Sequence, residues 1–218
     1  MAKLLFIEAR KKFDEDEIDF SKLDTLKAKT ISIAATVQYL NLVPIIKKYL
    51  ESRNFKVIIK KGAFYDAHVV GCNPSAFDKN ADILLLLADG KFHAINNALI
   101  INKEIYVFNT REIEKVTFQE IEKIKIKKQA LIKKFLLKDN IGLIVSTKIG
   151  QNFKQIEKIK IKIERLDKKV FIFEADSINL SELENFPEIE SWINTGCYGL
   201  AMDNNILLNL SDVLEFLN

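Results

Sequence analysis

Short apolar runs alternate with amphipathic segments along most of the chain. In the first half, this pattern predicts helices at 40–53 and 94–101 and strands at 30–36, 56–61, 82–88 and 104–109. The run at 82–88, DILLLLA, is apolar almost throughout, which predicts a strand buried on both faces. Strands and helices that alternate in this way are typical of parallel α/β units.

The second half repeats this order of elements. A helix is predicted at 152–166, and strands are predicted at 141–147, 169–174, 191–194 and 206–208. The segments TISIAAT and IGLIVST each end in a threonine before a predicted helix. The sequence therefore predicts an α/β protein with two similar three-layer domains, at 30–110 and 139–218, each built on a short, mainly parallel sheet.

Residues 111–138 are predicted to form a long helix that connects the two domains. Their apolar side chains recur at helical spacing, at Ile121, Ile124, Leu131 and Phe135. The stretches KIKIKK and IKIKI also alternate as strands do, but lysine and isoleucine are so abundant here that the alternation carries little weight. We expect this helix to pack across the domain junction.

Residues 1–29 contain one predicted strand, Lys3–Ala9, followed by an acidic, charged segment. No partner strand lies nearby in the sequence, and a strand needs a partner for its edge groups. We expect this strand to add to a sheet elsewhere in the fold or in another chain.

Composition narrows the class of protein. The chain has 218 residues, with 33 basic and 30 acidic side chains, and its lysines are spread along predicted helices. This distribution does not indicate a nucleic-acid partner. No apolar run reaches the length of a membrane span or of a signal-peptide core, so we expect a cytoplasmic protein without a membrane partner.

The two cysteines, Cys72 and Cys197, are the main candidates for chemistry. Cys72 lies in VVGCNPS, where the flanking Gly and Asn-Pro predict a tight turn at the strand ends, the edge where α/β folds bind ligands. Cys197 lies between two glycines in WINTGCYG, so backbone N–H groups can point at its sulfur, as they do in iron–sulfur sites. Their separation excludes a local zinc knuckle, so they can meet only if the two domains face each other. Taken alone, each cysteine is better explained as a small buried hydrophobe.

Two other segments follow predicted strands. ADGKFH places Lys91 and His93 where they could bind an anionic or adenine-bearing ligand, and STKIGQ places Thr147, Gly150 and Gln151 at the corresponding strand end. The second segment is too short for a phosphate loop. The simpler alternatives are a packed, hydrogen-bonded histidine and a threonine that caps a helix.

Together, these segments resemble the archaeal diphthamide biosynthesis enzymes, the 2-(3-amino-3-carboxypropyl)histidine synthase family. TVQY, VVGCN, ADGKFHAINNAL and EIYVFN resemble the middle domain of that family. LIVSTKIGQ and WINTGC, with the later Asp203, resemble its third domain, and LLFIEAR resembles the strand that ends its first domain. The resemblance extends over nearly the whole chain, in order.

The resemblance implies a [4Fe-4S] cluster held by one cysteine from each of three related domains around a central cavity, in a dimer. The iron without a cysteine would bind S-adenosylmethionine, and the reduced cluster would cleave the bond between sulfur and the γ-carbon. The 3-amino-3-carboxypropyl group would then pass to a histidine of translation elongation factor 2. Cys72 and Cys197 would be cluster ligands. Lys91, His93, Thr147, Gly150 and Gln151 are the residues expected to contact S-adenosylmethionine.

The sequence departs from the family pattern in two ways. Nearly all of the first domain is absent, together with its cysteine, and Tyr198-Gly199 follows Cys197 where the family usually has Pro-Arg. We therefore expect a subunit or truncated form that is active as a transferase only when a separate chain, or a homologous subunit, supplies the third cysteine. Two alternatives stay open: a non-catalytic accessory or ligand-binding subunit that supports a homologous synthase, and a remnant whose cysteines serve only in packing.

Overall fold

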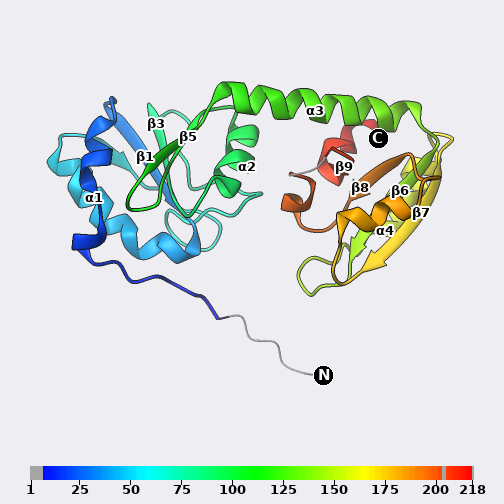
Figure 1. The fold of residues 1–218 in the computed structure, drawn as a ribbon, viewed down its shortest axis with the longest axis horizontal. Coiled ribbons are helices and arrows are strands. Elements are labelled where there is room, and N and C mark those ends of the chain that lie inside the picture. Colours follow the sequence, from blue (N-terminus) through cyan, green and yellow to red (C-terminus); the bar gives the residue numbers. More distant parts are fainter. Residues whose placement is uncertain (1–6, 203–204, 218) are drawn as a thin grey trace. The chain divides into compact units, whose positions relative to one another are not determined.

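The computed structural model describes residues 7–202 and 205–217 (Figure 1). The chain divides into two compact units, Met1–Glu122 and Lys123–Asn218. The boundary falls within helix α3 (Phe118–Leu137), which begins in the first unit and ends in the second. Asp203 and residues 3–6 of the predicted N-terminal strand lie outside the described residues.

The described residues of the first unit include a five-stranded sheet. Its elements are β1 (Thr30–Ala35), α1 (Val43–Ser52), β2 (Lys56–Ile58), β3 (Ile83–Leu87), α2 (Phe92–Ile101), β4 (Ile105–Phe108) and β5 (Ile113–Val116). The strands lie in the order β2-β1-β3-β4-β5. All neighbours are parallel except β5, which runs antiparallel to β4.

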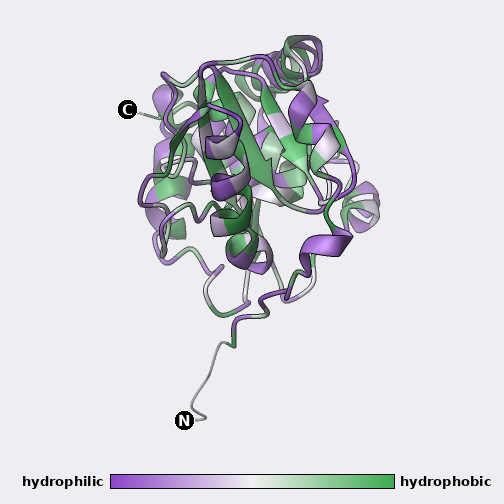
Figure 2. Cartoon of the chain, turned by 90° about the vertical axis from the view of Figure 1, so that its left-hand side faces the viewer, coloured by the Kyte–Doolittle hydropathy of each residue, from purple (hydrophilic) through white to green (hydrophobic). Residues whose placement is uncertain are grey.

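The central strand β3 is buried on both faces, as its apolar sequence predicts. Leu85 and Leu87 pack in one core cluster, which includes Ile46 and Leu50 of α1. Leu84 and Leu86 pack in the other, which includes apolar residues of α2. The two helices therefore cover opposite faces of the sheet, whose strands appear as a hydrophobic centre in Figure 2.

The described residues of the second unit include a four-stranded sheet. Its elements are β6 (Asn140–Ser146), α4 (Ile156–Glu164), β7 (Lys169–Ala175), β8 (Ser191–Asn194) and β9 (Leu207–Asn209). The strands lie in the order β7-β6-β8-β9 and are all parallel. Gly142 of β6 lets the Trp192 ring pack directly on the strand, because a Cβ atom at this position would lie 2.4 Å from the ring.

The two sheets share one strand order. In each unit the first strand lies between the second and the third, and the fourth follows the third. The predicted α/β class, with two similar and mainly parallel sheets, is therefore confirmed. Because Cys72 precedes β3 while Cys197 follows β8, the two cysteines lie in different connections of this shared order.

The predicted helix at 111–138 was wrong in its first part. Residues 113–116 form strand β5, which covers the edge of β4, and Val116 is fully buried. The helix begins only at Phe118, after a capping box in which Thr117 N donates to Glu120 Oε2 (2.8 Å) and Glu120 N donates to Thr117 Oγ1 (3.3 Å). Two other predicted elements are shorter than expected: α4 begins at 156 instead of 152, and β2 ends at 58 instead of 61.

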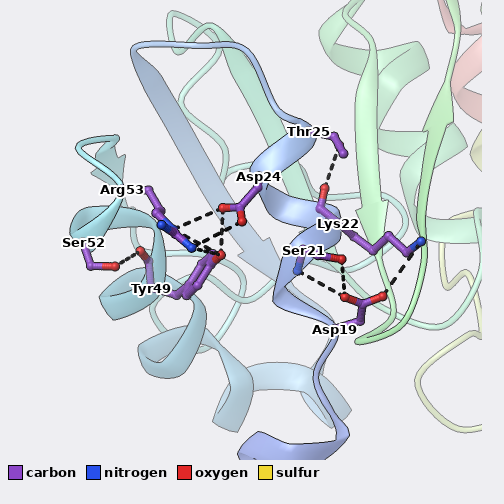
Figure 3. A network of polar contacts seen from close by, with 8 residues as sticks. All are labelled: Asp19, Ser21, Lys22, Asp24, Thr25, Tyr49, Ser52 and Arg53. Carbon is purple, nitrogen blue, oxygen red and sulfur yellow. Dashed lines mark hydrogen bonds and ion pairs between the residues drawn. The ribbon is translucent and has the colours of Figure 1, made fainter.

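The N-terminal segment packs on the first unit. Residues 7–9, the described part of the predicted strand at 3–9, belong to neither a helix nor a strand. Further on, the 3₁₀ helix η2 (Phe20–Thr25) is tied to α1, where Asp24 accepts a hydrogen bond from Tyr49 (2.7 Å) and pairs with Arg53 (3.2 Å) (Figure 3). Over residues 7–202 and 205–217, no helix is both long and apolar enough to cross a membrane.

Candidate functional site

Cys72 lies in a tight turn at the carboxyl edge of the first sheet. The segment before it runs beside the end of β1, where Val69 N donates to Ala35 O (2.9 Å). The turn is closed by Asn73 N, which donates to Val70 O (3.1 Å). The Cys72 thiol is free and exposed, so it is not a buried packing residue.

Helix α2 supports this turn through buried polar side chains. Asn97 is fully buried, and its Nδ2 donates to Val70 O (3.3 Å) and to His93 O (2.6 Å). Gly71 packs against the same helix, since a Cβ atom there would lie 3.3 Å from Asn96 Nδ2 and 4.0 Å from His93 Cδ2. The turn that carries Cys72 is therefore in direct contact with α2.

Several buried polar atoms near this turn have no hydrogen-bond partner among the described residues. They are Asn96 Nδ2 and Oδ1, Asn97 Oδ1 and His68 Nδ1. A buried polar group left without a partner costs about 1–3 kcal/mol. Such a cost is expected where a site has hydrogen-bonding capacity reserved for water or a ligand.

Two histidines lie at this edge. Burial lowers the pKa of His68 below its ordinary value of 6.5, and Arg10 lowers it further while Glu8 opposes the shift. Burial also lowers the pKa of His93, and the nearby His68 adds to this effect. Both imidazoles are therefore neutral at pH 7, and each can donate with one nitrogen and accept with the other.

Lys91 is paired with two carboxylates. Its Nζ lies 3.2 Å from Glu120 and 3.6 Å from Glu114, so it ties the loop after β3 to the start of α3 and to β5. The charge predicted to meet an anionic ligand is thus already paired within the first unit.

A cavity of about 580 Å³ also opens at the carboxyl edge of the first sheet. Inside it, Lys11 Nζ contacts Asp89 (2.5 Å) and Tyr39 OH (3.2 Å), and Lys11 is the main cause of the lowered pKa of Asp89. Its lining includes Lys11, Lys12, Phe13, Tyr39, Asp89, Asn109 and Arg111. None of the residues predicted to bind a cluster or S-adenosylmethionine lines this cavity.

In the second unit, Cys197 follows β8 and precedes the 3₁₀ helix η5 (Tyr198–Ala201). Its thiol is also free and exposed. Two buried asparagines, Asn194 and Asn209, end the neighbouring strands and hydrogen-bond to this loop. Cys197 therefore lies at the carboxyl edge of the second sheet.

The predicted residues Thr147, Gly150 and Gln151 lie in the exposed loop after β6. Their loop begins beside the Cys197 loop, since a Cβ atom on Gly196 would lie 3.2 Å from Ser146 Cβ. Thr147 does not cap the next helix, because α4 begins only at Ile156. The structure thus brings this loop to the same edge as Cys197, as it brings His93 close to the Cys72 turn.

The supporting asparagines, Asn96, Asn97, Asn194 and Asn209, were not identified from the sequence. Their signal is the presence of amides in apolar surroundings, in INNALII, SWIN and LLN. In residues 7–202 and 205–217, no group of three or more His, Cys, Asp or Glu side chains is placed to hold a metal ion. The donors from this chain that suit an iron–sulfur cluster are the two thiols.

Comparisons with known proteins agree on one family. The family model for diphthamide synthesis proteins matches residues 1–207. The 2-(3-amino-3-carboxypropyl)histidine synthase of Methanocaldococcus jannaschii is 29% identical over 161 residues, which cover 68% of this chain and 42% of that protein. The enzyme of the same name from Pyrococcus horikoshii is 24% identical over 206 residues, covering 86% of this chain and 60% of that protein.

A solved structure shares the fold. The crystal structure of Dph2 from Pyrococcus horikoshii with a 4Fe-4S cluster matches with a TM-score of 0.76 and 23% sequence identity. The match covers 91% of this chain and 60% of the other. The chain thus spans about half of the length of these relatives.

Proposed function

The chain belongs to the diphthamide synthesis protein family, and we propose that it is a subunit or a truncated form of the enzyme that begins diphthamide biosynthesis. That enzyme would transfer the 3-amino-3-carboxypropyl group of S-adenosylmethionine to a histidine of translation elongation factor 2. The observation that carries the proposal is the placement of Cys72 and Cys197. Each thiol is free, exposed and located at the carboxyl edge of a mainly parallel sheet, in a loop hydrogen-bonded to buried asparagines.

The residues around both cysteines fit an iron–sulfur cluster. Thiolates are the usual ligands of such clusters, and exposed thiols are accessible to iron. Near Cys72, the unpaired Asn96 amide has hydrogen-bonding capacity that polar ligands can use. Cys72 and Cys197 would hold the cluster, which would supply the electron that cleaves the bond between the sulfur and the γ-carbon of S-adenosylmethionine.

The remaining groups would bind and orient S-adenosylmethionine. The neutral imidazole of His93 can hydrogen-bond with the cosubstrate without adding a charge near its sulfonium. Thr147, Gly150 and Gln151 are exposed beside the Cys197 loop and offer hydroxyl, backbone and amide groups. Lys91 is paired with two glutamates, so it would contribute by fixing the position of the loop after β3 instead of contacting the cosubstrate.

A third cysteine would come from a separate chain that supplies the first domain, or from a homologous subunit. This part of the proposal rests on the number of thiols, because the chain contains two cysteines. Three thiolates around one cluster leave one iron open for S-adenosylmethionine, whereas two thiolates leave the cluster more accessible to solvent and more easily lost.

The test is anaerobic reconstitution of this chain with a candidate partner, such as a homologous synthase whose own function has been abolished. Iron and sulfide are measured per complex. Transfer of the labelled 3-amino-3-carboxypropyl group from S-adenosylmethionine to elongation factor 2 is measured in the same samples. We expect cluster absorbance at roughly 400 nm, typical of thiolate-ligated iron. We also expect loss of transfer in Cys72→Ala and Cys197→Ala. The variant Ser75→Ala, from the same loop as Cys72, is the matched control and should keep full transfer.

Two results would contradict this proposal. If no partnered sample contains a cluster, the proposed iron–sulfur site is refuted. A cluster and full transfer that persist in both cysteine variants would instead show an accessory subunit, which supports a homologous synthase without supplying ligands.

A further inference from the structure

The backbone around Cys197 is held by two buried side chains. Asn194 is 2% exposed, and its Oδ1 accepts from Gly196 N (2.9 Å) while its Nδ2 donates to Cys197 O (2.8 Å). Asn209 is 5% exposed, and its Nδ2 donates to Tyr198 O (3.1 Å). Three successive residues of the loop are thereby fixed by side chains from the ends of β8 and β9.

The two asparagines are also joined to each other. The Nδ2 of Asn194 donates to the Oδ1 of Asn209 at 2.8 Å, so that neither amide can rotate without breaking several bonds. Adjacent strands in a parallel sheet hold their ends at a fixed spacing, because their ladder bonds are regular. The loop is therefore bonded to the ends of two neighbouring strands, β8 and β9.

A partly buried ion pair fixes Asn209 in turn. Asp212, whose side chain is 8% exposed, accepts from Asn209 N (3.0 Å) and pairs with Lys128 of α3 at 2.9 Å. Burial opposes the charge of Lys128, but Asp212 and Tyr198 outweigh this and raise its pKa. Lys128 Nζ also lies 5.8 Å from the centre of the ring of Tyr198, the residue that follows Cys197.

All of these contacts use the backbone or the neighbours of Cys197 and leave its thiol free and exposed. A loop that only had to close the chain could satisfy these carbonyl groups with water, at less cost than burying two amides. Metal ligation has a stricter requirement, since the ligand must be held in one geometry by outer-shell contacts.

We propose that Asn194 and Asn209 are positioning residues that hold Cys197 in the conformation that binds iron. This inference rests on the proposed function. Side chains that orient metal ligands typically change metal affinity by about 10–100-fold when they are removed. We expect Asn194→Ala and Asn209→Ala to lose iron to a chelator about 10–100-fold faster than the wild type.

A matched control separates positioning from loss of stability. Leu208 lies beside Asn209 on β9, is 1% exposed and packs in the apolar core. Leu208→Ala should cost about 2–5 kcal/mol of stability, at least as much as either asparagine variant, yet leave the loop contacts intact. Its rate of iron loss should stay within about threefold of the wild type, since the outer shell of the ligand is unchanged.

The experiment measures chelator-driven iron loss and the electron paramagnetic resonance spectrum of the reduced cluster in the partnered, reconstituted samples. Faster loss and an altered spectrum in the two asparagine variants alone support the inference. If the wild type holds a cluster and the asparagine variants match the Leu208→Ala control, the positioning role is refuted while the cluster proposal stands. If the wild type holds no cluster, both are refuted.

Discussion

Asn97→Leu should release the Cys72 turn while leaving the stability of the first unit nearly unchanged. The substitution keeps the branching of the side chain but removes its donor and acceptor. Loss of the two bonds, to Val70 O (3.3 Å) and to His93 O (2.6 Å), should together cost about 1–3 kcal/mol. Against this, removing the buried Asn97 Oδ1, which has no partner among the described residues, should recover about 1–3 kcal/mol.

The two contributions nearly cancel, so the free energy of unfolding should change by about 1 kcal/mol or less. Asn97→Asp is the contrasting variant, because it places a carboxylate oxygen against the carbonyl groups of Val70 and His93. A buried charge without a partner should cost about 3 kcal/mol or more. Urea denaturation measures both values.

The local effect is read from amide hydrogen exchange. The N–H of Asn73 closes the Cys72 turn on Val70 O, and it should exchange about fivefold faster in Asn97→Leu, the equivalent of about 1 kcal/mol. The N–H of Ala81, bonded to Asp78 O in another turn of the same unit, should not change. A large loss of global stability in Asn97→Leu, or an unchanged Asn73 rate, would refute this reasoning.

Three further predictions follow from the same structure. Gly142→Ala should destabilise the second unit by about 3 kcal/mol in urea denaturation, since its Cβ would lie 2.4 Å from the Trp192 ring; a change below about 1 kcal/mol would contradict the packing. The pKa values of His68 and His93 are lowered below 6.5, so their contribution to stability is complete above pH 6.5 and is lost as the pH falls through their folded values. The free energy of unfolding should therefore fall from pH 7 to pH 5, less so in the double glutamine variant, and an equal fall in both would refute the assignment. Lys91→Met should change stability by about 1 kcal/mol or less, because its ion pairs are partly exposed, and a larger loss would mean that they contribute more than surface pairs do.

Hydrophobic periodicity predicts most of this fold. The run at 82–88 and the segment at 191–194 form strands close to the predicted bounds, because apolar runs of this length are buried in parallel sheets. The antiparallel strand β5 was missed because REIEKVT precedes a strongly helical segment and its pairing with β4 is a tertiary effect. The start of α3 could have been recognised from the Thr-x-x-Glu capping box at 117–120.

The candidate site was predictable only in part. Motifs located the cysteines and the strand-end loops, because the carboxyl edge of a parallel sheet is a general ligand-binding position. The supporting side chains were not predictable, because Asn97 meets Val70 and Asn209 meets Tyr198 only after the chain has folded. Likewise, nothing in the sequence around Lys91 shows that Glu120 pairs with it.

The central claim is that both thiols of this chain ligate one cluster, and thiol footprinting tests it most directly. Both cysteines are exposed in the described structure, so iodoacetamide should modify Cys72 and Cys197 in the metal-free chain. In the partnered, reconstituted sample, mass spectrometry should find both protected, and removal of iron by a chelator should restore modification of both. Modification of either cysteine at the metal-free rate while the cluster is intact would contradict the account.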